Sequence, residues 1–448
     1  MALFESEILR IKSKYGLSVT LKLHQEAIIR HLIERKDVFV LLPTGFGKSL
    51  TYILVPLLLD ELYPGKVHTA VVVSPLKALM ADQVKFLRSH GIKAMAITEE
   101  TSVKEIRENE VSVLYTSPEA AILQKWMKIL KEQFKDNICI LVFDEAHCIS
   151  SWGLDFRPGY RQVSVIQSLF DVPNLVLTAT ATKEIQRDIY DVLGFHRETT
   201  FVVSDLPNRP NIFIDLKECS EKYETELEWI LNLLLKWDTR HKIIVYVRSI
   251  NMCYQLYLWL VTRLMEKCFV GEEAGPSNRR VEMFHANTDK ESKERIINQF
   301  VKEDGTIEVL ISTVAFGMGI NIPNIDIVVH WGLPSSCISY WQEVGRCARD
   351  GRKGYAVCYA FKRSQSSCKD DTLKELALLS KCLRCSVLSN FLLDGMDNQS
   401  LKMLEMTGEC SCVCDVVCSC DKCKCCIVCQ NSCSCKSKVR EPLISFLC

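Results

Sequence analysis

The chain has 448 residues and no formal net charge, with 48% hydrophobic and 25% charged residues. This length exceeds one ordinary hydrophobic core, so we expect about two or three domains, and the composition is that of a soluble globular protein. A neutral chain lacks the overall basic character of many nucleic-acid-binding proteins, so a nucleic-acid site here needs local positive charge. The N-terminal residues do not resemble a signal peptide, and no apolar run is long enough to span a bilayer, which predicts an intracellular protein without a membrane partner.

A glycine-containing turn follows the apolar, β-branched stretch 37–42 and precedes a stretch typical of an apolar helix. Such a turn lets backbone N–H groups surround phosphates at a helix N-terminus, with Lys48 on the β- and γ-phosphates and the Ser49 hydroxyl on Mg²⁺. The strict phosphate-loop pattern has glycine where this chain has Leu42, so the match is to a relaxed form. A chance Gly-Lys-Ser turn in a surface loop is the alternative. The predicted ATP-binding residues of the turn are Thr44, Gly45, Phe46, Gly47, Lys48 and Ser49.

An acidic run, Asp144-Glu145-Ala146-His147, follows the strand-like stretch 138–143. Asp144 is therefore expected at the end of a strand, where its carboxylate can hold the same Mg²⁺ as Ser49, and Glu145 can polarise the attacking water. The two runs together predict an ATPase site in which Lys48, Asp144 and Glu145 are catalytic.

Two arginines, Arg346 and Arg349, lie in the stretch 342–351 and are three residues apart. This spacing predicts that both lie on one face of a helix. A planar, permanently charged guanidinium suits the charge that develops on a transferred phosphoryl group. We therefore predict that Arg349 is a catalytic arginine finger assisted by Arg346; solvated surface arginines are the alternative.

Apolar strand-like runs alternate with amphipathic helical stretches twice along the chain, which predicts two α/β domains with parallel sheets. With the phosphate-binding residues on the first domain and the arginines on the second, we expect ATP between them and a stroke that closes and opens the cleft. The expected strands are 38–42, 69–74, 112–116, 138–143 and 174–178 in the first domain and 242–247, 281–284, 309–312, 325–330 and 354–360 in the second.

Cysteine is distributed unevenly. Nine of the 23 cysteines are scattered before residue 380, whereas fourteen lie between Cys382 and Cys448 and eleven of these between Cys410 and Cys435. In a reducing compartment such clustering favours metal ligation over disulfides. No histidine follows His330, so a zinc site here must use four thiolates.

Over residues 15–425 the chain resembles RecQ-type DNA helicases of helicase superfamily 2. The motifs that carry the resemblance lie in family order at 74–84, 115–119, 178–182, 246–249, 284–286 and 313–320. The resemblance implies two tandem RecA-like parallel-sheet domains followed by a small helical, Cys-rich zinc-binding region. It also implies that Gln25 reads adenine and that Lys77, in the motif at 74–84, contacts the DNA strand. The expected domain bounds are 1–204 for lobe 1, 205–363 for lobe 2, 364–426 for the zinc-binding region and 427–448 for a Cys-rich tail.

Residues 151–160 resemble the aromatic-rich loop that distinguishes RecQ from other helicases with a DEAH motif. Trp152 and Phe156 could stack on unpaired bases while Arg157 contacts DNA, and His147 would carry the nucleotide state towards them. The loop departs from the family at Leu154, where a histidine is usual, and this puts the coupling of DNA binding to ATP hydrolysis in doubt. An aromatic core cluster is the alternative.

The cysteines near the C-terminus resemble the family's zinc-binding region, which opens with Cys-Arg and ends with Cys-Asp-x-Cys. We expect the zinc ligands to be Cys385, Cys412, Cys420 and Cys423, although the neighbouring cysteines leave the register open. A multi-metal tail like that of metallothionein and a disordered tail of idle thiols are the competing interpretations.

The resemblance implies an ATP-dependent 3′ to 5′ DNA helicase in repair, recombination or replication, with ATP, Mg²⁺ and Zn²⁺ as cofactors and single-stranded and tailed duplex DNA as partners. In a eukaryote the nucleus is the expected location, with the cytoplasm as an additional one. An RNA helicase of the same superfamily, and a DNA-stimulated ATPase or scaffold that does not separate strands, are the alternatives.

Overall fold

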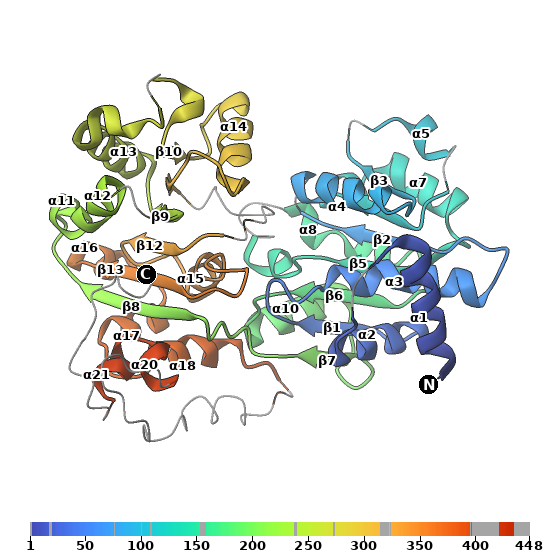
Figure 1. The fold of residues 1–448 in the computed structure, drawn as a ribbon. Coiled ribbons are helices and arrows are strands. Elements are labelled where there is room, and N and C mark those ends of the chain that lie inside the picture. Colours follow the sequence, from blue (N-terminus) through green and yellow to red (C-terminus); the bar gives the residue numbers. More distant parts are fainter. Residues whose placement is uncertain are drawn as a thin grey trace. The chain divides into compact units, whose positions relative to one another are not determined.

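The computed structural model describes residues 2–17, 20–75, 77–99, 101–107, 110–152, 158–236, 240–271, 274–313, 322, 324–394, 396 and 421–433. The chain divides into two compact units (Figure 1). Unit 1 contains residues 1–207 and the short segment Phe391–Met396, and unit 2 contains the rest. No helix in the described ranges combines the length and apolarity needed to cross a membrane.

Unit 1 is built on a seven-stranded sheet with the order β3-β4-β2-β5-β6-β1-β7, and all its strand pairs are parallel. Parallel strands are covered on both faces, which is why β1 and β2 consist of apolar residues without alternation and are fully buried. The strands are β1 (Val38–Leu41), β2 (Thr69–Val73), β3 (Ala94–Ile97), β4 (Val113–Thr116), β5 (Ile138–Phe143), β6 (Asn174–Thr178) and β7 (Phe201–Ser204).

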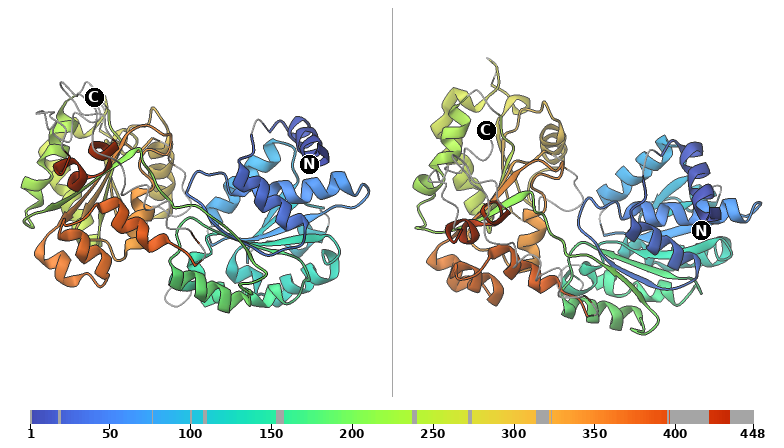
Figure 2. Two further views of the ribbon diagram at one scale, coloured as in Figure 1. Left: turned by 90° about the horizontal axis from the view of Figure 1, so that it is seen from below. Right: turned by 60° about the horizontal axis from the view of Figure 1, so that its bottom comes forward.

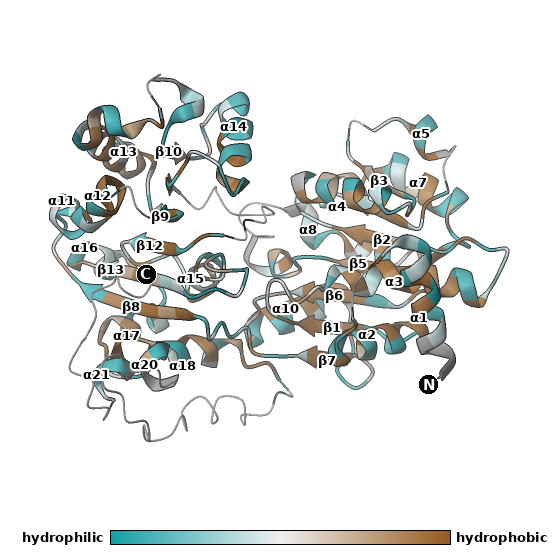
Figure 3. Cartoon of the chain, in the orientation of Figure 1, coloured by the Kyte–Doolittle hydropathy of each residue, from teal (hydrophilic) through white to brown (hydrophobic). Residues whose placement is uncertain are grey.

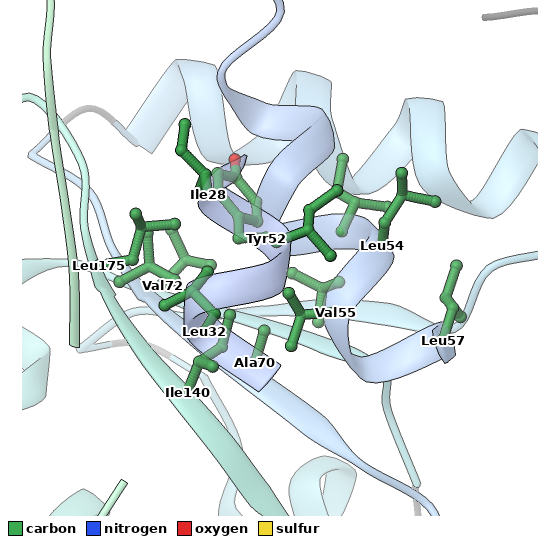
Figure 4. Packing of buried hydrophobic residues seen from close by; sticks show 14 of the residues in the cluster. Ile28, Leu32, Tyr52, Leu54, Val55, Leu57, Ala70, Val72, Ile140 and Leu175 are labelled. Atoms are coloured by element: carbon green, nitrogen blue, oxygen red, sulfur yellow. The ribbon is translucent and has the colours of Figure 1, made fainter. Parts of the chain in front are cut away.

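Helices lie on both faces of this sheet (Figure 2). The most apolar of them, α3, packs Tyr52, Leu54 and Val55 into the main core of unit 1, where they meet Val72 of β2 (Figure 4). The helices of unit 1 are α1 (Ala2–Tyr15), α2 (Leu23–Ile33), α3 (Ser49–Leu62), α4 (Lys77–Ser89), α5 (Val103–Arg107), α6 (Pro118–Ala121), α7 (Gln124–Gln133), α8 (Pro158–Arg161), α9 (Ser164–Gln167) and α10 (Lys183–Leu193), with the π-helical turn η1 (Cys148–Trp152).

Helix α10 holds the segment Phe391–Met396, which belongs to unit 1 although it lies late in the sequence. It begins at the N-cap Thr182, whose hydroxyl accepts from the Ile185 N–H, and ends at Gly194 in the left-handed conformation. The backbone N–H of Asp394 donates to Gln186 of α10, and its carboxylate pairs with Arg187 at 3.2 Å. The short segment 391–396 is thereby held by charge and hydrogen bonds on unit 1.

Unit 2 has a six-stranded parallel sheet with the order β10-β11-β9-β12-β13-β8. Most residues of its strands are apolar, and the middle of β8 is coloured as hydrophobic although the strand also contains charged residues (Figure 3). The strands are β8 (Ile212–Glu218), β9 (Ile243–Val247), β10 (Val281–Phe284), β11 (Val309–Ser312), β12 (Ile327–Trp331) and β13 (Gly354–Ala360).

The last helices of the chain lie beside β8, the edge strand of this sheet (Figure 1). One isolated bridge pairs Ile214 of β8 with Cys426 between two of these helices. The Cys-rich region is thus packed on unit 2. Its helices are α17 (Asp371–Ala377), α18 (Leu383–Leu388), α20 (Asp421–Cys425) and α21 (Ile427–Asn431). The other helices of unit 2 are α11 (Tyr223–Glu226), α12 (Glu228–Leu235), α13 (Ile250–Leu264), α14 (Lys290–Val301), α15 (Cys337–Val344) and α16 (Lys362–Ser367), with the short 3₁₀ turns η2 (Met265–Cys268), η3 (Pro276–Asn278) and η4 (Ser389–Phe391).

The prediction of two parallel-sheet domains is confirmed, but three strands are missing from it. β3 and β7 have only four residues each and are partly exposed, so neither carries a long apolar run. β8 contains Asp215 and Lys217, which break the apolar pattern. Asp215 is nevertheless buried because the Tyr355 hydroxyl of β13 donates a hydrogen bond to its carboxylate.

Candidate active site

The turn between β1 and α3 has the backbone shape that the sequence predicts for a phosphate loop. Gly45 and Gly47 have φ values of 80° and 86°, a left-handed region that glycine enters without strain. A Cβ at Gly47 would lie 2.8 Å from Nε2 of Gln25, so a larger residue there would displace the Gln25 amide. α3 begins at Ser49, directly after Lys48, so the loop leads into a helix N-terminus.

Gln25 of α2 holds the tip of this loop. Its side-chain amide is buried and donates to the carbonyls of Phe46, at 3.2 Å, and Gly47, at 2.9 Å. The Lys22 ammonium lies 4.1 Å from the centroid of the Phe46 ring, a cation–π contact on the same tip. The predicted adenine-reading residue therefore also fixes the loop backbone. Thr44 lies in the loop and is partly buried.

Lys48 and Ser49 face inwards at the base of the loop. The Lys48 ammonium donates to the carbonyls of Leu42, at 2.9 Å, and Pro43, at 3.2 Å. The Ser49 hydroxyl is hydrogen-bonded to Tyr52, whose pKa is raised by burial. The cation and the hydroxyl predicted to contact phosphate and metal thus lie on adjacent residues at one helix end.

Asp144 directly follows β5, and its N–H donates to the Val73 carbonyl at the end of β2, at 2.9 Å. Asp144 is partly buried. Burial raises the pKa of Asp144 to about 7; the neighbouring charge of Glu145 adds to the rise, and the nearby Lys48 cation opposes it. Asp144 and Ser49 both act on the pKa of Tyr52, so a carboxylate and a hydroxyl, oxygen ligands that suit Mg²⁺, lie near one side chain.

Glu145 and His147 connect the acidic run to the end of β6. Glu145 has a φ of 49°, an uncommon conformation for a residue with a side chain. Nδ1 of His147 lies 3.4 Å from a Glu145 carboxylate oxygen and 3.2 Å from the hydroxyl of Thr178. Burial lowers the pKa of His147, so the ring is neutral near pH 7 and can exchange hydrogen bonds with both groups. The motif at 178–182 is therefore brought against the acidic run.

The predicted DNA-contacting residues are only partly placed. Lys77 begins α4 and forms an exposed 2.8 Å ion pair with Glu99. Trp152 ends η1, the turn that follows the acidic run. Phe156 and Arg157, and Leu154 with them, lie outside the described residues.

Arg346 and Arg349 lie on unit 2, but the prediction that they share a helical face is wrong. α15 ends at Val344, and both arginines lie in the turn that precedes β13. Ala348 between them has a φ of 46°, which is incompatible with a continued right-handed helix. The Nε of Arg349 donates to the Gly345 carbonyl at 3.4 Å.

A buried polar group that the sequence analysis missed lies beneath these arginines. Glu343 of α15 accepts from Nε2 of His330 at 2.8 Å, and the His330 ring stacks on Tyr246 of β9. Arg346 and Arg349 are close enough to Tyr246 to oppose the rise that burial causes in its pKa. In the sequence, a histidine near the end of a buried strand is only a weak signal of a functional site. Such a histidine is more often a core residue whose hydrogen bonds are all made within the fold.

Four thiols converge at the edge of unit 2. Cys382 precedes α18, Cys425 ends α20, Cys426 precedes α21 and Cys429 lies within α21, and their sulfurs all lie within 4.8 Å of one another. The Cys382 sulfur lies 3.6 Å from that of Cys425 and 4.0 Å from that of Cys426. Tetrahedral zinc with Zn–S bonds of about 2.3 Å separates its sulfurs by about 3.8 Å, so this group fits the ion. Hydrogen bonds among the thiols lower the pKa of Cys426 and raise the pKa values of Cys382, Cys425 and Cys429, so Cys426 is the first of the four to become a thiolate.

This group differs from the four predicted zinc ligands. Cys412 and Cys420 lie outside the described residues, whereas Cys385 and Cys423 are buried close by without belonging to the group. Cys385 is hydrogen-bonded to Cys382. The dense run Cys423-Lys424-Cys425-Cys426 indicates a metal site at this point of the sequence. With so many adjacent cysteines, the sequence did not show which of them are ligands.

Each unit of the chain matches a family of known proteins. The DEAD/DEAH box helicase family model matches residues 22–188, and the helicase conserved C-terminal domain matches residues 225–351. Among curated proteins, "ATP-dependent DNA helicase Q-like 2" of Arabidopsis thaliana is 33% identical, over 78% of this chain and 48% of its own length. "ATP-dependent DNA helicase RecQ" of Haemophilus influenzae is 32% identical, over 78% and 52%. "Putative ATP-dependent RNA helicase R290" of Acanthamoeba polyphaga mimivirus is 31% identical, over 79% and 60%. The chain thus spans about half to three fifths of the length of these relatives.

Solved structures show the same fold at low identity. MrfA, a DUF1998 helicase bound to DNA, aligns with a TM-score of 0.61 at 19% identity, over 79% of this chain and 48% of that chain. Dbp5 of S. cerevisiae, bound to RNA and ADP BeF3, aligns with a TM-score of 0.61 at 18% identity, over 89% and 96%. The two parallel-sheet units, with their phosphate loop, DEAH run and paired arginines, thus correspond to the DEAD/DEAH box domain and the helicase conserved C-terminal domain. Many relatives of this chain are RecQ-family helicases, at about 30% identity over most of its length, so the chain is similar to that family.

The loop geometry predicts that Gly47→Ala weakens nucleotide binding. The new Cβ would meet Gln25 at 2.8 Å in a backbone conformation that costs a residue with a side chain about 1–2 kcal/mol, so we expect roughly tenfold lower affinity. Titration of a fluorescent ATP analogue in the presence of Mg²⁺ measures the change. Gly91→Ala is the matched control, because Gly91 has a φ of 75° in open space and lies outside the loop. Equal affinity in the two variants would contradict the assignment.

Proposed function

We propose that this chain is an ATP-dependent DNA helicase of RecQ type that moves 3′ to 5′ along single-stranded DNA and unwinds tailed duplexes in repair, recombination or replication. The observation that carries the proposal is the phosphate-loop backbone of Gly45 and Gly47 before Lys48, together with Asp144 directly after β5, in a chain that is similar to RecQ-type helicases. A lysine at a helix N-terminus and an acidic residue whose charge acts on it suit phosphoryl transfer. RecQ-type relatives named as ATP-dependent DNA helicases support DNA as the substrate.

The residues of unit 1 have distinct proposed roles in hydrolysis. Lys48 and the N–H groups of the loop hold the phosphates, and Gln25 reads the adenine while it fixes the loop. Glu145 orients the attacking water and takes its proton. The Ser49 hydroxyl and the Asp144 carboxylate would hold Mg²⁺, which neutralises charge on the phosphate oxygens when it is bound.

The arginines of unit 2 are proposed to act on the transition state. Arg349, assisted by Arg346, would stabilise charge on the transferred phosphoryl group when the two units close on ATP. His147 would transmit the nucleotide state from Glu145 to the segment around Thr178 and to the loop that contains Trp152. Trp152 and Phe156 would stack on unpaired bases, with Arg157 and Lys77 on the phosphates.

The four thiols of Cys382, Cys425, Cys426 and Cys429 are proposed to hold one structural Zn²⁺. This group ties α18, α20 and α21 together in a region with little core of its own, so metal binding would supply much of its folding free energy. We also propose a nuclear location for the protein in a eukaryote, with the cytoplasm as an additional one.

The strand-displacement test described below can also support either of two other functions. A relative named as a putative RNA helicase makes RNA unwinding the nearest alternative. A DNA-stimulated ATPase or scaffold without strand separation is the second, because this chain has Leu154 where the family usually has histidine.

Strand displacement on four substrates tests the proposal: 3′-tailed DNA, 5′-tailed DNA, blunt DNA and tailed RNA duplexes, with ATP hydrolysis followed in parallel. We expect unwinding of the 3′-tailed DNA only. Glu145→Gln should retain ATP binding and lose turnover by orders of magnitude, since it removes the base but not a phosphate contact. Preference for the RNA duplex, or hydrolysis without displacement, would replace the proposal with one of the alternatives.

Zinc content tests the thiol group and its register. We expect about one zinc per chain in protein purified under reducing conditions, and loss of that zinc in Cys429→Ser. Cys139→Ser is the matched control, because Cys139 lies in unit 1 away from the group. Retention of zinc in Cys429→Ser with loss in Cys420→Ser would favour the ligand set expected from the sequence. Several equivalents of zinc per chain would indicate a multi-metal cluster.

A further inference from the structure

The turn that carries the two arginines is held by a third arginine from another part of unit 2. Arg209 lies in the Asn-Arg-Pro-Asn stretch at the start of the unit. Its guanidinium donates to the carbonyls of Gly345 at 2.9 Å, Cys347 at 2.9 Å and Ala348 at 2.8 Å. One planar fork therefore caps three carbonyls of a single turn, and these carbonyls flank Arg346 and Arg349.

This turn needs an external support. It continues past the end of α15, and its N–H groups already serve the last carbonyls of that helix, those of Trp341, Glu343 and Val344. Ala348 adopts a left-handed φ of 46°, which costs about 1–2 kcal/mol for a residue with a Cβ. Asn211 adds a second donor from the same stretch, with its amide 3.0 Å from the Ala348 carbonyl. The Ala348 N–H in turn donates to Ile325 at 2.7 Å.

The stretch that contains Arg209 is itself held by a fully buried arginine of α18. Arg384 is 2% exposed, and Nη1 donates to the Arg209 carbonyl at 2.7 Å and to the Asn208 side chain at 3.0 Å. Nη2 donates to the carbonyls of Ile212 and of Cys425, the latter at 3.2 Å. A buried guanidinium that loses its hydrogen-bond partners destabilises the fold strongly. We therefore expect these bonds to form together.

Arg384 also connects this stretch to the thiol group. Arg384 lies two residues after Cys382, and its guanidinium binds the backbone of Cys425. It is therefore connected to two cysteines of the group. Cys426, the third member, is bridged to Ile214 of β8, two residues beyond Ile212. Two guanidinium groups and one short backbone stretch thus join the four thiols to the turn of Arg346 and Arg349 within unit 2.

We propose that Arg209 is a positioning residue for Arg346 and Arg349, and that Arg384 makes their position depend on the folded, metal-loaded thiol group. The inference rests on the proposed ATPase function. It extends that function by giving the Cys-rich region a role in the rate of hydrolysis. Arg209 holds the turn in the shape from which the finger reaches the phosphoryl group, and a displacement of about 1 Å at such a group lowers a rate by about 100-fold.

The test compares steady-state ATP hydrolysis of Arg209→Gln, Arg209→Lys and Arg349→Ala with that of the wild-type chain in saturating single-stranded DNA. For Arg209→Gln we expect kcat to fall roughly 10- to 100-fold while KM and the affinity for a fluorescent ADP analogue change by less than about twofold. Arg209→Lys keeps the charge but loses the fork, so its kcat should be intermediate. Arg295→Gln is the control for the loss of an arginine contact in unit 2, since Arg295 donates to the Pro276 carbonyl at 2.7 Å and pairs with the buried Glu282 at 2.8 Å, both outside the turn.

A double mutant separates positioning from general destabilisation. If Arg209 acts through the finger, Arg209→Gln combined with Arg349→Ala should hydrolyse ATP no more slowly than Arg349→Ala alone. Additive losses, a kcat equal to that of Arg295→Gln, or a loss of nucleotide affinity would overturn the positioning role. An inactive wild-type chain would instead contradict the proposed function itself, whereas a normal Arg209→Gln beside a crippled Arg349→Ala would contradict only this inference.

The dependence on the thiol group has a readout other than activity. Hydrogen exchange of the wild-type chain, with its metal and after chelation, should show faster exchange in peptides covering 208–212 and 345–349 once the metal is removed. Peptides covering 42–49 of unit 1 should be unchanged and serve as the internal control. Unchanged exchange at 345–349 after chelation would overturn the link between the thiol group and the arginine turn.

Discussion

The charge interaction between Asp144 and Lys48 is the interaction on which the rest of the site depends. Loss of hydration favours the neutral carboxylic acid and a nearby cation favours the carboxylate, so Lys48 opposes the rise in the pKa of Asp144. The parallel sheet of unit 1 supplies that proximity, because β1 and β5 run in the same direction and end at the same edge. The phosphate loop and the acidic run can therefore meet although about a hundred residues separate them.

The parts of the site that depend on local sequence could be predicted. The two glycines of the loop have the left-handed φ values that the motif requires, and Asp144 follows a buried strand as the apolar run before it indicates. Two parallel-sheet domains followed from the same alternation of apolar runs and amphipathic helices. These features are encoded within a few residues, where backbone sterics and strand burial decide the outcome.

The parts that depend on contacts between distant residues could not be predicted. The spacing of Arg346 and Arg349 suggested a helical face, but tertiary hydrogen bonds from Arg209 hold that segment as a turn after α15. Nothing near Arg209 in the sequence shows what it binds, because its carbonyl partners lie more than a hundred residues away, and most partners of Arg384 are equally distant. The thiol group was missed for a similar reason: with so many cysteines nearby, only the packing of α21 on β8 selects Cys429 over its neighbours.

The most direct measurement is ATP hydrolysis by the wild-type chain with Mg²⁺, in the presence and absence of single-stranded DNA. The account predicts slow hydrolysis without DNA, a marked increase when DNA is added, and no hydrolysis when Mg²⁺ is chelated. A folded chain that binds ATP but hydrolyses it at the same rate with and without DNA would contradict a DNA-driven motor. A folded chain that neither binds nor hydrolyses ATP would contradict the assignment of the Lys48 and Asp144 site itself.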